Sequence, residues 1–95
     1  MPPGMTALRV VIEGRVQGVW FRAWTVQEAQ ARGLDGWVRN RRDGTVEALF
    51  AGPAGQVSDM LEACHQGPAH ANVIAVHTHD GELPAEKGFS QISSA

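Results

Sequence analysis

The chain has 95 residues, of which 43% are hydrophobic and 19% are charged, a size and composition typical of one small globular domain. No apolar run approaches the roughly 18 residues that a membrane-spanning helix needs, and the first residues lack the basic start and apolar stretch of a signal peptide. The single cysteine excludes an internal disulfide. We therefore expect a small cytoplasmic protein that folds on its hydrophobic core.

The net charge of −2 conceals an asymmetry along the chain. Residues 1–42 hold all seven arginines and three acidic residues, whereas residues 43–95 hold one lysine and seven acidic residues. Arginine pairs with phosphate through two parallel hydrogen bonds, so its excess in the first half suggests an anion site there. A codon bias toward arginine, alanine and glycine would give the same composition, and the arginines alone do not decide between these interpretations.

The first elements follow from hydrophobic periodicity. Residues 1–6 are expected to form a flexible tail, and residues 7–95 a single domain. Apolar residues alternate over Ala7–Glu13, which predicts a strand with one face in the core. A loop over Gly14–Val19 then leads into a helix predicted over residues 21–32, because that stretch contains helix formers and no Gly or Pro.

The rest of the chain continues in the same way, with Gly and Pro between the elements. These elements are a hairpin of Gly36–Arg41 and Thr45–Ala51 about Asp43-Gly44, a helix over residues 55–66, a strand over Asn72–His79 and a short stretch, Phe89–Ile92, that offers a fifth strand. The βαββαβ order predicts a ferredoxin-like α+β sandwich, in which two helices pack on one face of an antiparallel sheet.

The loop between the first strand and the first helix is the most informative segment. Backbone N–H groups of such a turn, together with the helix N-terminus, form a cradle for an anion. Gly14 and Gly18 allow positive φ and close approach of a ligand, and Arg22 lies where its guanidinium could close over a phosphate. A G-x-x-x-G loop alone is more often a tight turn, so both interpretations stay open here. A Walker A loop is excluded, because no Lys followed by Ser or Thr comes after Gly18.

Two longer patterns carry a resemblance to a known family. Residues Gly14–Arg22 read G-R-V-Q-G-V-W-F-R and resemble the first signature of the acylphosphatase family. Residues Gly36–Val46 read G-W-V-R-N-R-R-D-G-T-V and resemble its second signature. The resemblance covers about residues 8–80. It departs at the end, where the family has Phe-x-Ile in alternation and this chain has Phe89 and Ile92 three residues apart, so the register of the last strand stays open.

The resemblance implies hydrolysis of the carboxyl–phosphate bond of a small-molecule acyl phosphate, without a metal or other cofactor. It implies that Arg22 binds the phosphoryl group, that Asn40 positions the attacking water, and that the loop binds phosphate mainly through its backbone. The loop residues are Arg15, Val16, Gln17, Gly18, Val19, Trp20 and Phe21. Inorganic phosphate and sulfate are expected to compete as anions, with no nucleic-acid or membrane partner and with a monomeric protein. The acyl group of the physiological substrate is not defined by the sequence.

Simpler interpretations compete at individual residues. Asn40, at a strand end, could make only a local turn hydrogen bond. Cys64 lies on the apolar stripe of a predicted helix, and the three tryptophans are expected in the core or at its rim. His77 and His79 share one strand face, but two histidines without a third ligand nearby rarely hold a metal.

Two other functions are kept as alternatives. A non-catalytic nucleic-acid-binding module of the same fold would use the basic first half and the tryptophans. Against it, the strand from Thr45 lacks the aromatic platform of RNA-recognition modules. A phosphate-sensing domain would keep the anion site without turnover.

Overall fold

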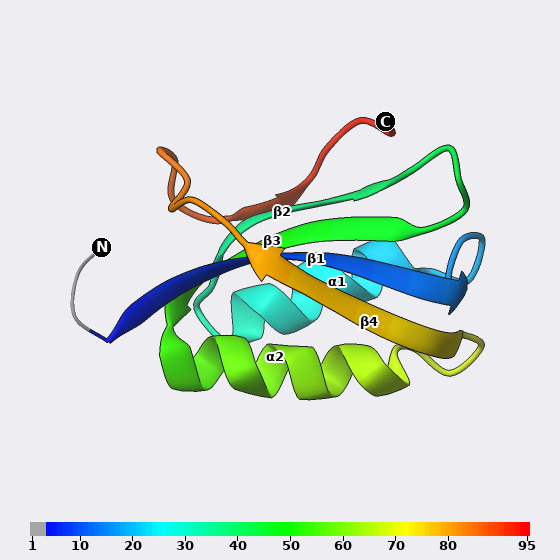
Figure 1. Cartoon of the computed structure of the whole chain (residues 1–95), viewed down its shortest axis with the longest axis horizontal. Coiled ribbons are helices and arrows are strands. Elements are labelled where there is room, and N and C mark those ends of the chain that lie inside the picture. The colour runs from blue at the N-terminus through cyan, green and yellow to red at the C-terminus, as the bar shows by residue number, and fades with distance from the viewer. Residues whose placement is uncertain (1–3) are drawn as a thin grey trace.

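Two helices and five strands make up the fold, which the computed structural model describes for residues 4–95 (Figure 1). In chain order they are β1 (Met5–Arg15), α1 (Phe21–Ala31), β2 (Asp35–Asn40), β3 (Val46–Pro53), α2 (Ala54–Gln66), β4 (Asn72–Asp80) and β5 (Phe89–Gln91). Both helices cover the same face of one sheet, whose strand order is β4-β1-β3-β2-β5. The predicted ferredoxin-like α+β fold is therefore confirmed.

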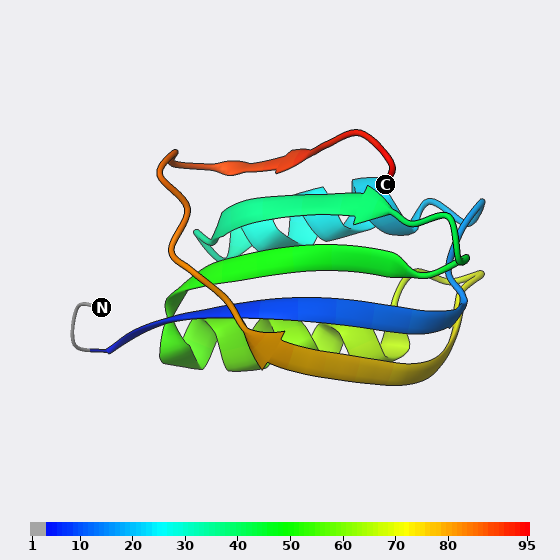
Figure 2. The same cartoon turned by 45° about the horizontal axis from the view of Figure 1, so that its top comes forward.

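The sheet differs from the prediction at one edge. β1 runs antiparallel to β3 and β4, and β2 runs antiparallel to β3, whereas β5 pairs in parallel with β2. The cause is the path of the chain after β4, which crosses the helix-free face of the sheet before entering β5 (Figure 2). Phe89 then pairs with Gly36, which settles the register that the sequence left open. The sheet is mixed rather than wholly antiparallel.

The first strand begins earlier than expected. Met5 and Thr6, assigned to the tail from the sequence, belong to β1 and pair with Pro53 and Gly52 of β3. The rest of the predicted tail, residues 1–3, lies outside the described residues. β1 is thus longer than its apolar alternation indicated, because backbone pairing with β3 does not depend on which side chains are apolar.

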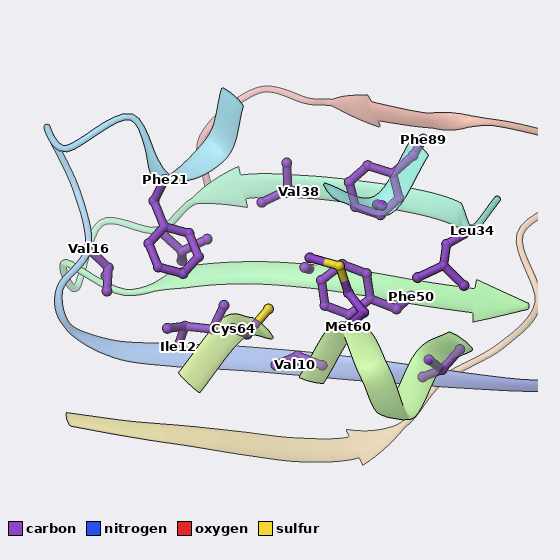
Figure 3. Close-up of a cluster of buried hydrophobic side chains, with 14 of the residues drawn as sticks. Val10, Ile12, Val16, Phe21, Leu34, Val38, Phe50, Met60, Cys64 and Phe89 are labelled. Atoms are coloured by element: carbon purple, nitrogen blue, oxygen red, sulfur yellow. The ribbon is translucent and has the colours of Figure 1, made fainter. Parts of the chain in front are cut away.

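The main core lies between the sheet and the two helices (Figure 3). Its largest fully buried side chains include Phe21, Phe50, Ile12, Leu34 and Met60. The rings of Phe50 and Phe89 stack with their centroids 5.5 Å apart, so β5 is held to the sheet by core packing as well as by its backbone. Cys64 is buried here, as its position on the helical stripe predicted.

The helix-free face carries a buried carboxylate between two arginines. Glu47 accepts a hydrogen bond from Arg39 Nε at 2.7 Å and one from Arg9 Nη1 at 3.0 Å. Burial alone would raise the pKa of Glu47, but the two arginine hydrogen bonds outweigh it and hold the pKa below its ordinary value. The guanidinium of Arg39 also lies over the Trp37 ring, 5.0 Å from its centroid. These arginines and this tryptophan therefore serve the structure of the sheet.

A bulge interrupts the regular alternation of side chains along β4. Glu13 pairs with Ala75 and Gly14 with Val73, so one extra residue of β4, Ile74, has no partner in β1. Val73 therefore packs against the core together with Val76, three residues on, and Ile74 is 75% exposed. Strict alternation along a strand would place Val73 and Val76 on opposite faces, and the bulge brings both to the core.

The last residues continue along β2 beyond the regular strand. Ile92 N–H donates to the carbonyl of Val38 at 2.9 Å, and Ala95 N–H donates to the carbonyl of Asn40 at 3.0 Å. Arg42 N–H in turn donates to the carbonyl of Ala95 at 2.7 Å. The C-terminal end of β2, which carries Asn40, is thereby flanked by backbone on both sides.

Candidate active site

A cavity of about 430 Å³ opens where the β1–α1 loop, the start of α1 and the ends of β2 and β5 meet. It is lined by Val16, Gly18, Trp20, Phe21, Arg22, Ala23, Asn40 and Gln91. Arg22 and Asn40, which the sequence placed in one site although 18 positions separate them, therefore face the same cavity.

Apolar anchors hold the β1–α1 loop in place. The side chains of Val16, Val19 and Phe21 are buried in the main core. Figure 3 shows Val16 and Phe21 at the end of that core nearest the loop, beside Ile12 and Cys64. The N–H groups of residues 16–20 donate no hydrogen bond to any backbone or side-chain acceptor of residues 4–95. The loop is thus a fixed backbone with unused donors, as an anion cradle requires.

Two glycines give the loop its path. Gly14 has φ +131°, and a Cβ there would overlap the carbonyl oxygen of Asn72. Only glycine therefore lets β1 approach β4 closely at the bulge. Gly18 has φ +73°, and a Cβ there would meet no heavy atom within 4 Å. This open space beside Gly18 lets a ligand approach the backbone.

The N-terminus of α1 has no side-chain cap. Trp20 is the N-cap residue, no side chain of residues 4–95 accepts a hydrogen bond from an N–H group of the first turn, and that turn contains no acidic residue. The partial positive charge of the helix end is therefore uncompensated. Arg22 adds a full positive charge in the same turn, where the helix dipole disfavours a cation. An anion bound between Arg22 and the helix end would compensate the partial charge of the helix end and the charge of Arg22.

Arg22 differs from most arginines of the chain in its partners. Four others form ion pairs: Arg9 and Arg39 with Glu47, Arg32 with Glu28 and Asp59, and Arg41 with Asp43. Within residues 4–95, the Arg22 guanidinium makes no hydrogen bond or ion pair. The N–H groups of the Arg22 guanidinium are therefore available to bind a ligand in the cavity.

Asn40 ends β2 with an unsatisfied oxygen. Its Oδ1 atom is buried and has no hydrogen-bond partner among the described residues. A buried carbonyl oxygen without a donor is uncommon, and in native proteins it is usually satisfied by water or marks a functional site. The local turn hydrogen bond that the sequence offered as an alternative is made instead by Asp43, whose Oδ1 accepts from the N–H and hydroxyl of Thr45. These bonds lower the pKa of Asp43.

The side chain of Gln17 has a role that the sequence did not indicate. Its Nε2 donates to the carbonyl of Arg41 at 2.8 Å and to that of Thr45 at 2.9 Å. The resemblance implied that Gln17, like the rest of the loop, contributes mainly its backbone. The structure shows that the amide ties the β1–α1 loop to the β2–β3 hairpin, directly after Asn40. Nothing in the local sequence pattern signals this contact, because it joins residues 24 and 28 positions apart.

Gln91 is a second residue that sequence analysis missed. It lines the cavity from β5, two residues after the buried Phe89 and therefore on the same face of the strand. The sequence pattern relates Phe89 to Ile92, three residues on and out of alternation, whereas Gln91 holds the alternating position. Ile92 is instead 37% exposed.

The remaining candidate groups lie elsewhere. Nε2 of His77 is 2.8 Å from Oε2 of Glu13 on the sheet, and within residues 4–95 no three His, Cys, Asp or Glu side chains lie close enough together to hold a metal ion. Burial raises the pKa of the Cys64 thiol to about 12, which leaves it protonated and unreactive at neutral pH. Trp24 contacts Phe21 edge-on, as expected for the core, whereas Trp20 is 79% exposed and not packed as predicted.

The fold and the site together define a class of protein: a ferredoxin-like domain with a candidate anion-binding loop between β1 and α1. Comparison with known proteins agrees. The family model described as acylphosphatase matches residues 8–91. An acylphosphatase of Rhodospirillum rubrum is 54% identical over 87 residues, covering 92% of this chain and 96% of the relative. One of Rhizorhabdus wittichii is 48% identical over 89 residues, covering 94% and 90%.

Solved structures give the same result. The crystal structure of acylphosphatase from Bacillus subtilis is similar with a TM-score of 0.87 and 36% identity, covering 93% of this chain and 98% of that one. The chain therefore belongs to the acylphosphatase family. It is a hydrolase that acts on acid anhydrides. Within residues 4–95, no helix is long and apolar enough to cross a membrane.

Proposed function

We propose that the protein hydrolyses the carboxyl–phosphate bond of acyl phosphates to a carboxylate and inorganic phosphate. The observation that carries the proposal is the meeting, in one cavity, of Arg22 and Asn40 with the donor-rich loop. Arg22 supplies an unpaired cation, and residues 15–21 supply backbone N–H groups. These are groups that bind a phosphoryl oxygen. Asn40 supplies a buried oxygen that accepts a hydrogen bond from water.

The chemical steps need little beyond this placement. A water held by Asn40 Oδ1 attacks phosphorus in line with the acyl oxygen, whose bond to phosphorus breaks as the carboxylate leaves with the electron pair. One water proton passes to a phosphate oxygen, since an amide is not a base at neutral pH. The products are a carboxylate and a dihydrogen phosphate monoanion, so charge balances. A carboxylate is a good leaving group, and positioning with charge stabilisation supplies most of the rate in phosphoryl transfer.

The rest of the proposal concerns partners. We further propose that the enzyme is monomeric and cytoplasmic, acts on a small molecule without a metal, and is inhibited competitively by inorganic phosphate and sulfate. A nucleic-acid interface on the open sheet face is disfavoured, because Arg9 and Arg39 there are already bonded to Glu47 and Trp37 packs against Leu49 and its neighbours.

The test is release of inorganic phosphate from benzoyl phosphate in the presence of EDTA. We expect turnover by the wild type and a fall in kcat/KM of about 10³-fold or more for Arg22→Ala, because the phosphoryl charge loses its counter-charge. Arg42→Ala is the matched control: it removes one exposed arginine outside the cavity, and its kcat/KM should stay within about twofold of wild type. A folded wild type that binds phosphate without turnover would instead favour the phosphate-sensing alternative.

A further inference from the structure

Trp20 combines two features that are unusual for a tryptophan. Its φ of +66° and ψ of +19° place it in the left-handed region, and among residues 4–95 it is the only non-glycine residue with positive φ. Its side chain is 79% exposed, more than any other large hydrophobic residue described. Left-handed backbone is unfavourable for a bulky residue, and tryptophan is usually well buried. Packing among the described residues explains neither the backbone conformation nor the exposure of Trp20.

The position of Trp20 relates both features to the cavity. Trp20 lines the same cavity as Arg22 and Asn40, but from the solvent side, whereas the Asn40 oxygen is buried in its wall. Backbone strain that persists in a folded protein concentrates at functional sites. The conformation at Trp20 keeps a large apolar surface at the cavity mouth, where the chain itself does not cover it.

The direction of the reaction indicates what would cover this surface. In-line attack requires the attacking water and the leaving carboxylate to lie on opposite sides of phosphorus. If the water is on the buried Asn40 oxygen, the acyl group extends away from that wall, toward the exposed mouth. The cavity of about 430 Å³ lies in the range of roughly 300–1,000 Å³ that holds organic ligands, so it has room for more than a phosphoryl group.

From this geometry we infer that Trp20 is a specificity-determining residue, whose indole packs against the acyl group and favours aromatic acyl phosphates over small ones such as acetyl phosphate. The inference rests on the proposed function, because it takes the phosphate end of the substrate as held by Arg22. Gln91 forms another part of the lining and offers an amide to the carbonyl of the same acyl group.

The experiment compares kcat/KM for benzoyl phosphate with kcat/KM for acetyl phosphate. Trp20→Gly removes the indole and accepts the positive φ, Trp20→Asn replaces it by a polar side chain that tolerates this backbone, and Trp20→Phe retains an aromatic ring. Because any loosening of the loop affects both substrates, the ratio isolates the contact with the acyl group. The benzoyl-to-acetyl ratio should fall about 3- to 10-fold in the Gly and Asn variants, the usual size of an aromatic contact. It should stay near wild type in the Phe variant.

A control variant and a binding measurement separate a failure of the Trp20 inference from a failure of the proposed function. Ile74→Ala removes another exposed apolar side chain, outside the cavity, and should leave the ratio unchanged. Phenacylphosphonate and acetonylphosphonate replace the anhydride oxygen by a methylene, so their dissociation constants test the same contact without turnover. An unchanged ratio in Trp20→Gly, for substrates and phosphonates alike, overturns the role of Trp20 and leaves the proposed function intact. If the wild type hydrolyses neither substrate, the proposed function fails, and the phosphonate pair alone decides the role of Trp20.

Discussion

Asn40→Ala should move activity and stability in opposite directions. In the proposed mechanism its amide oxygen holds the attacking water but does not contact the phosphoryl group. We therefore expect kcat to fall by about 10²–10³-fold, the usual cost of losing one group that acts in the transition state. KM and the inhibition constant of inorganic phosphate should change little, because Arg22 and the loop still bind the anion.

The stability change follows from the unsatisfied Oδ1 atom. No protein group among the described residues donates to this oxygen, so Asn40→Ala loses no protein hydrogen bond, and it removes a partly desolvated polar atom together with part of the packing of the side chain. A net gain between zero and about 1 kcal/mol in the free energy of unfolding is expected. For a domain of this size, 1 kcal/mol corresponds to a rise of about 4–8 °C in Tm.

Phosphate release and thermal unfolding on the same samples measure both effects. Asn40→Asp is a useful companion, because it keeps the shape but places a carboxylate beside the phosphoryl site, so KM and the phosphate inhibition constant should rise. Retention of most of the turnover in Asn40→Ala would refute the water-holding role. A fall of several degrees in Tm would show that the amide oxygen is bonded within the folded chain and is structural.

Two further predictions concern residues around the site. Gln17→Ala should lower the free energy of unfolding by about 1–2 kcal/mol in urea titrations, since two hydrogen bonds are lost but both hairpin carbonyls keep a backbone donor. It should lower kcat more than it raises KM, and an unchanged unfolding midpoint would contradict the tie between loop and hairpin. The pKa of Glu47 is lowered in the folded protein, so its ion pairs with Arg9 and Arg39 stabilise the protein above the ordinary pKa of about 4.3 and are lost as pH falls through the folded value. Urea titrations from pH 6 to pH 3 should therefore show a steeper loss of stability in wild type than in Glu47→Gln, and parallel curves would exclude this role.

Most of the fold could be predicted because its signals are local. Alternation, helical stripes and Gly-Pro breaks gave every element to within a few residues, including the hairpin about Asp43-Gly44. What was missed depends on pairing between distant segments. The bulge that exposes Ile74 arises only when β4 meets Gly14 of β1, and the parallel direction of β5 depends on the path of the chain across the sheet.

The site residues also differ in whether a local sequence pattern could predict them. Arg22 and Asn40 lie in motifs that can be read from a single stretch of sequence, and both line the cavity. The side-chain bonds of Gln17 and the place of Gln91 join segments far apart in the chain and left no local pattern. The exposure of Trp20 could not be predicted either. Tryptophan is usually buried, and the exposed position depends on the left-handed backbone at this residue, which the sequence does not reveal.

The order of the strands has a consequence for how the enzyme acquires activity during folding. β1 pairs with β4, whose partner residues lie 57 to 72 positions later, and the cavity takes residues from the first quarter of the chain and from β5 near its end. Such non-local pairing slows folding, since long loops must close before the contacts form. The cavity is complete only once β5 has paired with β2, so a chain with only the central hairpin and helices formed lacks one wall of its active site. Recovery of phosphate release after dilution from denaturant would therefore report the last docking event, and comparison with the recovery of helical circular dichroism would time it.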